Sequence, residues 1–157
     1  MSYKAGLGGV ENFKKRLEAV KVSLIDEEAL TTVSKAAKEI ILKRTSDGVS
    51  IEGSTFAPYS SSYKIVREKK GMPSDKVDLR RTGEMLDDLA VEVNAGIMQS
   101  EIFFETDESI EKARTHQVFG AGRNNVRRRF FGLSEEEKSG LTAFYWSHIE
   151  RVLLENR

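Results

Sequence analysis

The stretch Ala113-Arg-Thr-His-Gln-Val-Phe-Gly-Ala-Gly-Arg-Asn-Asn-Val-Arg-Arg-Arg-Phe-Phe-Gly-Leu133 joins the middle of this chain to its last helix. A helix-like start is followed by a His-Gln-aromatic-Gly corner and a loop of glycine and asparagine. Three arginines then lead into two phenylalanines and a glycine. Arg and Phe are enriched where proteins bury surface against one another. The stretch therefore predicts a contact surface, and it carries no catalytic signature.

The last helix has the clearest start signal in the sequence. Ser134 and Glu137 form a capping box, because each side chain can bond the other residue's free backbone amide. The residues that follow at helical spacing on one face are Leu141, Tyr145, His148, Ile149 and Val152. This spacing predicts a long C-terminal helix with one buried face.

A second long helix is predicted from about Asp26 to Arg44. Its apolar residues recur every three or four positions, at Leu30, Val33, Ala37, Ile40 and Ile41. Acids at its start and bases at its end suit the helix dipole. We expect residues 1–9 to form a flexible tail, a further helix from about Val10 to Val20, and a single domain over residues 10–157.

Residues 45–80 lack sustained periodicity and contain both prolines of the chain. A loop of this length is usually functional or disordered, so we expect a mobile arm that orders on assembly. A short helix is predicted from Tyr63 to Lys70. The candidate contacts of this loop are Tyr63, Lys64 and Arg67.

The centre of the chain predicts a small sheet between short helices. Residues 79–89 suggest a helix that points Leu79, Met85, Leu86 and Leu89 inward. Strands are predicted around Val91 and Val93 and over Ile97 to Phe104, with a hairpin turn at 94–96. A helix from Glu108 to about His116 follows. The fold class is therefore α+β, with a small antiparallel sheet packed by the long N-terminal and C-terminal helices.

The overall composition excludes several functional classes. The formal net charge is zero, which argues against a general nucleic-acid binder. The absence of cysteine excludes a disulfide framework and a thiolate metal site. No signal core or membrane-spanning run is present, so we expect synthesis in the cytoplasm and no membrane partner.

No known catalytic pattern occurs in the sequence. His116 and His148 are the only histidines and lie outside any HExxH motif. Asp87 and Asp88 are adjacent, so on a helix they point about 100° apart and form no acid–base pair. No nucleophile elbow, P-loop or dinucleotide fingerprint is present. We therefore expect a protein that is not an enzyme and has no cofactor or metal.

Charge is sorted along the chain. Nine acids and no Lys or Arg lie between Glu84 and Glu111, whereas six bases and no acid lie between Lys112 and Leu133. The two blocks could pair within one molecule. They could instead be complementary faces that meet between copies, and such a head-to-tail contact closes into a ring when the rotation permits.

The arginine-rich loop over residues 123–129 allows two other interpretations. Arginines beside Phe130 and Phe131 could bind nucleic acid through phosphate pairing and base stacking. Alternatively, the arginines are solvated and the two phenylalanines belong to the core. The neutral charge of the whole chain disfavours the nucleic-acid interpretation.

Three pieces of the sequence together suggest a family. They are Gly48 to Tyr63 with Thr-Phe-Ala-Pro-Tyr-Ser at 55–60, Leu-Arg-Arg-Thr-Gly-Glu-Met at 79–85, and the corner from Ala113 to Ser134. Their order over about residues 30–155 resembles the tailed-phage virion-morphogenesis proteins of the tail-completion and head–tail joining group. The family often has proline beside the final arginine, where this chain has Val126 and further arginines.

This resemblance implies a structural virion protein at the tail end or neck, made in the cytoplasm of a bacterial host. It implies a homo-oligomeric ring, such as a hexamer, with tail-tube and neck or connector proteins as partners and DNA passing through. We place the ring contact between acids (Glu84, Asp87, Asp88, Glu101, Glu105) and arginines (Arg123, Arg127, Arg128, Arg129). The expected turns and anchors are Gly83, His116, Gly120, Phe130, Phe131 and Gly132.

Overall fold

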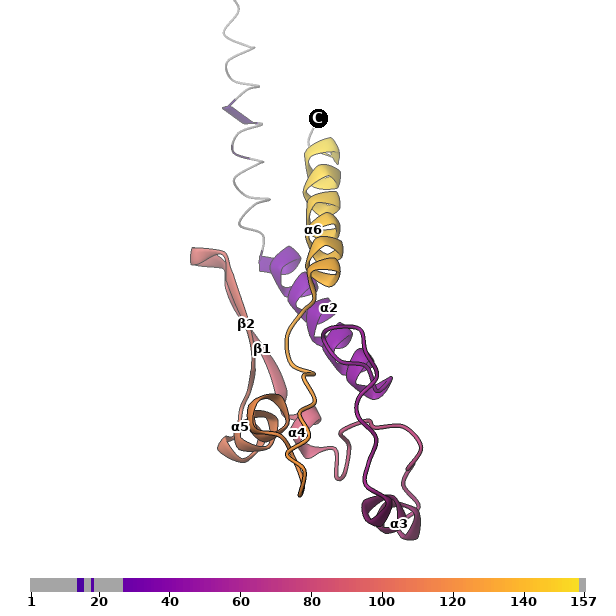
Figure 1. The fold of residues 1–157 in the computed structure, drawn as a ribbon. Coiled ribbons are helices and arrows are strands. Elements are labelled where there is room, and N and C mark those ends of the chain that lie inside the picture. The colour runs from indigo at the N-terminus through magenta and orange to yellow at the C-terminus, as the bar shows by residue number, and fades with distance from the viewer. Residues whose placement is uncertain (1–13, 16–17, 19–26, 156–157) are drawn as a thin grey trace, which may run out of the picture.

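The computed structural model describes Lys14, Lys15, Glu18 and residues 27–155 (Figure 1). The tail predicted at residues 1–9 lies outside the described residues, as does most of the helix predicted over 10–20. The elements in chain order are α2 (Glu27–Ser46), α3 (Ser61–Lys69), α4 (Glu84–Asp87), β1 (Leu89–Asn94), η1 (Ala95–Ile97), β2 (Gln99–Phe104), α5 (Asp107–Arg114), η2 (Thr115–Phe119) and α6 (Glu135–Glu155).

The predicted α+β fold is confirmed. Strands β1 and β2 form a two-stranded antiparallel sheet, and α2 packs against both strands. Helix α6 packs chiefly on α2, so α2 lies between the sheet and the C-terminal helix (Figure 1). A two-stranded sheet is marginal by itself, and this helical cover supplies the apolar surface that it needs.

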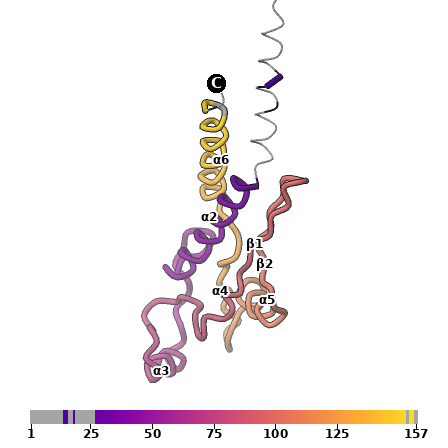
Figure 2. The backbone as a smooth tube through the Cα atoms, turned by 180° about the vertical axis from the view of Figure 1, so that it is seen from behind, coloured from indigo at the N-terminus to yellow at the C-terminus, as the bar shows by residue number. Residues whose placement is uncertain are grey.

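The hairpin has one inward face and one outward face. Leu89 pairs with Phe104, and both side chains are buried against the rest of the fold. On the outward face, Glu92 stands directly opposite Glu101. The chain reverses through the 3₁₀ turn η1, so β2 starts at residue 99, two residues later than predicted. The turn projects away from the helices in both views (Figures 1 and 2).

The core is assembled from nearly every part of the described chain. Phe130 and Ile41 are almost completely inaccessible to solvent. The other buried members of this cluster are Phe56, Val77, Leu79, Met85, Leu86, Leu89, Phe104 and Ala113. Each fully buried aliphatic or aromatic side chain contributes about 1.5–3 kcal/mol through the hydrophobic effect.

The helix predicted over residues 79–89 is wrong in its extent. Only Glu84–Asp87 is helical, because Leu79 (φ 53°) and Gly83 (φ 95°) have positive φ before it and Leu89 begins β1. The four residues predicted to point inward, which include Leu79 and Leu89, are all buried. The hydrophobic pattern therefore identified the buried side chains correctly but not the backbone that carries them.

The two long helices follow their sequence signals closely. In α2, Ala37 and Ile41 are buried as predicted, but Ser34 and Thr45 continue the buried stripe. The capping box of α6 is confirmed, since the Glu137 amide donates to Ser134 Oγ at 3.2 Å and the Ser134 amide donates to Glu137 Oε2 at 2.7 Å.

Residues 45–80 form a folded excursion around α3. Phe56 and Val77, one near each end, are buried in the core. Between them the Arg67 guanidinium is 1% exposed and joins α3 to the returning chain. The short helix predicted at 63–70 is present as Ser61–Lys69. These contacts argue against the mobile arm that was expected.

Candidate assembly interface

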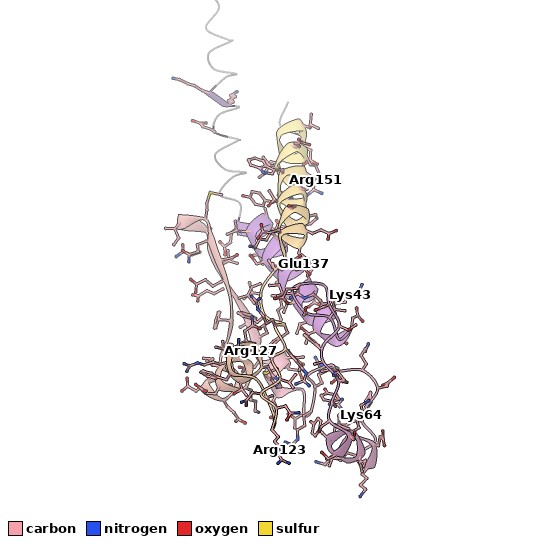
Figure 3. All side chains as sticks on the ribbon, in the orientation of Figure 1. Lys43, Lys64, Arg123, Arg127, Glu137 and Arg151 are labelled. Carbon is pink, nitrogen blue, oxygen red and sulfur yellow. The ribbon has the colours of Figure 1, made fainter. Side chains whose placement is uncertain are left out.

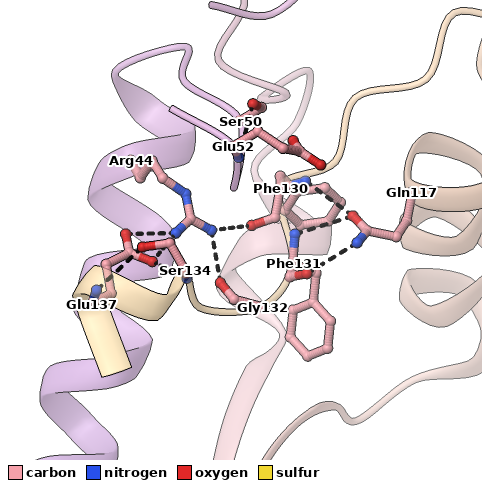
Figure 4. A network of polar contacts seen from close by, with 9 residues as sticks. All are labelled: Arg44, Ser50, Glu52, Gln117, Phe130, Phe131, Gly132, Ser134 and Glu137. Atoms are coloured by element: carbon pink, nitrogen blue, oxygen red, sulfur yellow. Dashed lines mark hydrogen bonds and ion pairs between the residues drawn. The ribbon is translucent and has the colours of Figure 1, made fainter. Parts of the chain in front are cut away.

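The corner at residues 113–134 is held by the side chain of Gln117. Its Oε1 accepts hydrogen bonds from the backbone amides of Phe130 at 3.0 Å and Phe131 at 3.2 Å. Its Nε2 donates to the Phe131 carbonyl at 3.0 Å (Figure 4). One amide side chain therefore satisfies three backbone groups of a segment that has no strand or helix of its own.

Arg44 of α2 holds the same segment from the opposite side. Its Nη2 donates to the carbonyls of Phe130 at 2.7 Å and Gly132 at 2.8 Å, and its Nη1 forms an ion pair with Glu137 (Figure 4). Partial burial favours the neutral form of Glu137, but bonds from the Ser134 amide and Arg44 outweigh it and lower the pKa of this carboxyl. The arginine thus joins α2, the corner and α6.

The phenylalanines after the arginine run belong to the core, as predicted. Phe130 is 0% exposed, and the ring centroid of Phe131 lies 5.2 Å from that of Phe104. Rings in these positions cannot stack on nucleic-acid bases. The nucleic-acid interpretation of the Arg-Phe sequence therefore loses its aromatic component.

The glycines predicted at turns occupy backbone conformations that suit glycine. Gly83, Gly120 and Gly132 all have positive φ, at 95°, 87° and 121°. A Cβ at Gly120 would stand 2.0 Å from the Asn125 carbonyl oxygen. Gly120 therefore lets the chain enter a tight loop, which the backbone pairing of Ala121 with Val126 closes.

The role predicted for the His116 side chain is wrong. Its Nδ1 is buried without a hydrogen-bond partner among the described residues, and Gln117 holds the corner instead. The backbone carbonyl of His116 accepts a bond from the Arg128 amide at 2.8 Å. Burial, together with the charge of Arg128, lowers the pKa of the imidazole below its ordinary value.

The four candidate arginines of the loop have different environments. Arg128 is buried, and its guanidinium donates to the carbonyls of Ala57 at 3.0 Å and Pro58 at 3.3 Å. Arg128 is therefore not available to a neighbouring molecule, which corrects its assignment to the interface. Arg129 is exposed and pairs with Glu52 at 2.5 Å.

Arg123 and Arg127 are the members of this set that fit a contact surface. Both are exposed, and neither side chain makes an ion pair or hydrogen bond with any residue that the structure describes. Both are labelled below the hairpin turn in Figure 3, and Arg123 lies farther from the turn than Arg127 in this view.

Part of the acidic block is neutralised within the chain. Glu84 pairs with Lys112 at 3.4 Å, and Asp87 pairs with Arg80 at 2.8 Å. Asp88 Oδ2 accepts bonds from the Thr106 amide and hydroxyl, which lowers the pKa of its carboxyl. These three acids have local structural partners, so their place in the predicted ring contact is weakened.

Of the acids in this block that form no ion pair with a described residue, all but Asp107 of α5 lie on the hairpin or directly next to it in the chain. Glu101 and Glu105 are exposed and form no ion pair with a described residue. Glu92 was not among the candidates, although it faces Glu101 across the strands. Like charges directly opposite on a sheet destabilise it, so this pair favours a cationic partner outside the hairpin.

The candidate loop contacts divide in a similar way. Tyr63 and Lys64 are half-buried on α3, whereas Arg67 is buried and cannot meet a neighbour. The Arg67 guanidinium lies 4.7 Å from the ring centroid of Tyr59. Burial and the nearby charge of Asp78 raise the pKa of Tyr59 to about 12, so this hydroxyl stays protonated in neutral solution.

The described part of the chain offers neither a metal site nor a helix that could span a membrane. It contains no group of three or more His, Asp or Glu side chains arranged to hold a metal ion. It also contains no helix whose length and apolar character would suit a bilayer span.

No protein-family model, curated protein or solved structure matches the chain.

Proposed function

We propose that this chain is a structural assembly protein of a tailed phage or prophage that acts in tail completion or head–tail joining. It works as a homo-oligomeric ring in the virion, at the neck or tail end, with tail-tube and connector proteins as partners. The motifs at 48–63, 79–85 and 113–134 support the family assignment. A ring subunit needs two unlike faces, and the charge arrangement supplies them.

One observation carries this proposal. Exposed acids that pair with no described cation gather on the hairpin and directly after it, and two exposed arginines that pair with no described acid lie on the loop over residues 121–126 and just after it. Arg123 lies far from the hairpin turn (Figure 3). No ion pair joins these acids to these arginines among the described residues of one copy, whereas a second copy can bring them together.

Reversal of the exposed arginines tests the proposal. Arg123→Glu with Arg127→Glu should weaken self-association at low salt, because the hairpin acids would then meet acids. Arg128 is left unchanged, since reversal of a buried arginine would disturb the fold. Lys35→Glu with Lys43→Glu is the control, as both lysines are exposed on α2 and the net charge changes equally.

Sedimentation velocity at low and moderate salt gives the measurement. We expect the wild-type protein and the lysine control to form the same oligomer, and the arginine variant to sediment as a smaller species. Moderate salt should also weaken the wild-type oligomer, because exposed charges are screened. Unchanged assembly of the arginine variant would count against this contact. The proposed location in the virion is tested separately, by mass spectrometry of purified virions.

Nucleic-acid binding by the loop is the alternative function. Arg123 and Arg127 are exposed and could contact phosphates of DNA that passes through the neck. With Phe130 buried, base stacking would have to come from another ring, and Phe119, just before the loop, is 53% exposed. Salt-dependent retention of DNA by the purified protein, lost in the Arg123→Glu and Arg127→Glu variant, would favour this alternative.

A further inference from the structure

Helix α3 has an inverted distribution of polar and apolar residues. Its one buried side chain is Arg67, whereas Ile65 and Val66 are 52% and 43% exposed. Ser62, Ile65, Val66 and Lys69 follow the spacing of a single helical face, and all four are exposed. An apolar stripe normally faces the core of a domain, so this outward stripe requires another explanation.

The outward orientation is fixed by a polar clamp. Arg67 Nε donates to the Pro73 carbonyl at 2.5 Å, and Nη1 donates to the Arg80 carbonyl at 2.8 Å. Nη2 bonds both carboxylate oxygens of Asp78 at 3.0 Å. Rotation of the apolar face inward would carry Arg67 out of these contacts and leave the Asp78 carboxylate and the carbonyls of Pro73 and Arg80 without their donor.

The hairpin turn has the complementary chemistry. Ile97 is 66% exposed and Met98 is 44% exposed, so the turn presents an apolar tip. Three acids and no base lie between Leu89 and Glu105. The outward side of α3, by comparison, carries Lys69, followed directly by Lys70.

The relative positions exclude a contact within one molecule. Helix α3 and the hairpin turn lie far apart in both views (Figures 1 and 2). Each surface combines two exposed apolar side chains with charge, and the two charges have opposite sign. A second copy can therefore satisfy both surfaces in one head-to-tail contact.

We propose that the outward face of α3 in one copy binds the β1–β2 hairpin turn of the next copy. Ile65 and Val66 cover Ile97 and Met98, and the lysines that follow neutralise the hairpin acids. This contact rests on the self-association proposed above. It adds the outward face of α3 to the arginine loop as a second surface through which the copies associate. The 45–80 excursion is then a rigid docking element.

Thiol cross-linking tests the contact directly, because the chain contains no cysteine. Val66→Cys and Met98→Cys proteins are prepared separately, mixed and treated with a short bismaleimide. Docking raises the local thiol concentration to about the millimolar range, so covalent dimer should form roughly 100-fold faster than by collision at micromolar concentration. Ser139→Cys replaces Met98→Cys in the control mixture, since Ser139 is exposed on α6.

The outcomes separate this contact from the proposed function. Rapid cross-linking in the Val66 and Met98 mixture, but not in the control mixture, supports the contact. Cross-linking at the control rate in a protein that still self-associates by sedimentation overturns this contact and leaves the proposed function standing. A protein that stays monomeric at every concentration overturns both.

Discussion

Arg67 and Asp78 form a buried ion pair in which one guanidinium nitrogen bonds both carboxylate oxygens at 3.0 Å. The pair connects α3 to the chain that returns to the core. Arg67→Ala should lower the free energy of unfolding by about 3 kcal/mol, because Asp78 is left without its partner. Urea denaturation followed by circular dichroism measures this loss.

The neighbouring lysine supplies a control for this substitution. Lys69 is exposed and has no hydrogen bond or ion pair with a described residue, so Lys69→Ala should change stability by less than about 0.5 kcal/mol. Arg67→Lys should recover little of the loss, since an ammonium cannot reproduce the planar, two-sided contacts. Equal effects of the Arg67 and Lys69 substitutions would contradict the clamp.

Gly120 and Gly122 offer a matched pair in one loop. Both have positive φ, at 87° and 74°, so Gly122→Ala should cost about 1–2 kcal/mol through backbone strain alone. Gly120→Ala should cost distinctly more, because the new Cβ also meets the Asn125 carbonyl. Thermal melting of the two variants provides the comparison, and identical melting temperatures would exclude the clash.

Gln117 should be more important for stability than its surface position suggests. Gln117→Ala leaves the amides of Phe130 and Phe131 without their acceptor, and each unsatisfied buried group costs about 1–3 kcal/mol. Val118 is 49% exposed, so Val118→Ala serves as the control with little expected change. Hydrogen exchange should show faster exchange of the two amides only in the Gln117 variant.

His116 should make stability depend on pH below about its ordinary pKa of 6.5. Its pKa is lowered in the folded state, so the unfolded chain binds more protons in this range and acid favours unfolding. Stability should therefore be complete above pH 6.5 and decline as the pH falls toward the folded-state pKa. His116→Asn should flatten this part of the profile, as measured by urea denaturation at several pH values.

Glu137 should contribute a separate acid-sensitive step. Its folded-state pKa lies below the ordinary value of 4.5, so its ion pair with Arg44 stabilises the fold above that pH and is lost on further acidification. Glu137→Gln should reduce stability at neutral pH and remove this step. The loss of stability below pH 6.5 that depends on His116 should remain unchanged in the Glu137→Gln variant.

Local signals predicted much of the fold because they act over a few residues. The capping box at Ser134 and Glu137 and the spacing of Ala37 and Ile41 need only neighbouring positions to be effective. The helix over residues 79–89 failed because Leu79 and Gly83, which both have positive φ, interrupt the helical backbone before Glu84. The hydrophobic periodicity could not reveal this interruption, because the buried side chains keep the spacing that a helix would give them.

The sequence predicted the charge of the candidate site but not which of its charged side chains are exposed. The loop was identified from composition, and two of its four arginines prove to be exposed without an ion pair to a described residue. Arg67 and Arg128 look like surface charges in a sequence but are buried. Glu92 was recognised as a candidate only when the strand register placed it opposite Glu101.

The amino-acid sequence by itself determined where the helices start, which residues carry apolar character and how charge is sorted along the chain. Only the tertiary structure decided which arginines enter the interior, because each guanidinium needs carbonyl groups that converge from distant segments. Ala57 and Pro58 supply them for Arg128, and Pro73 and Arg80 supply them for Arg67. Burial of charge depends on these partners, and sequence proximity does not define them.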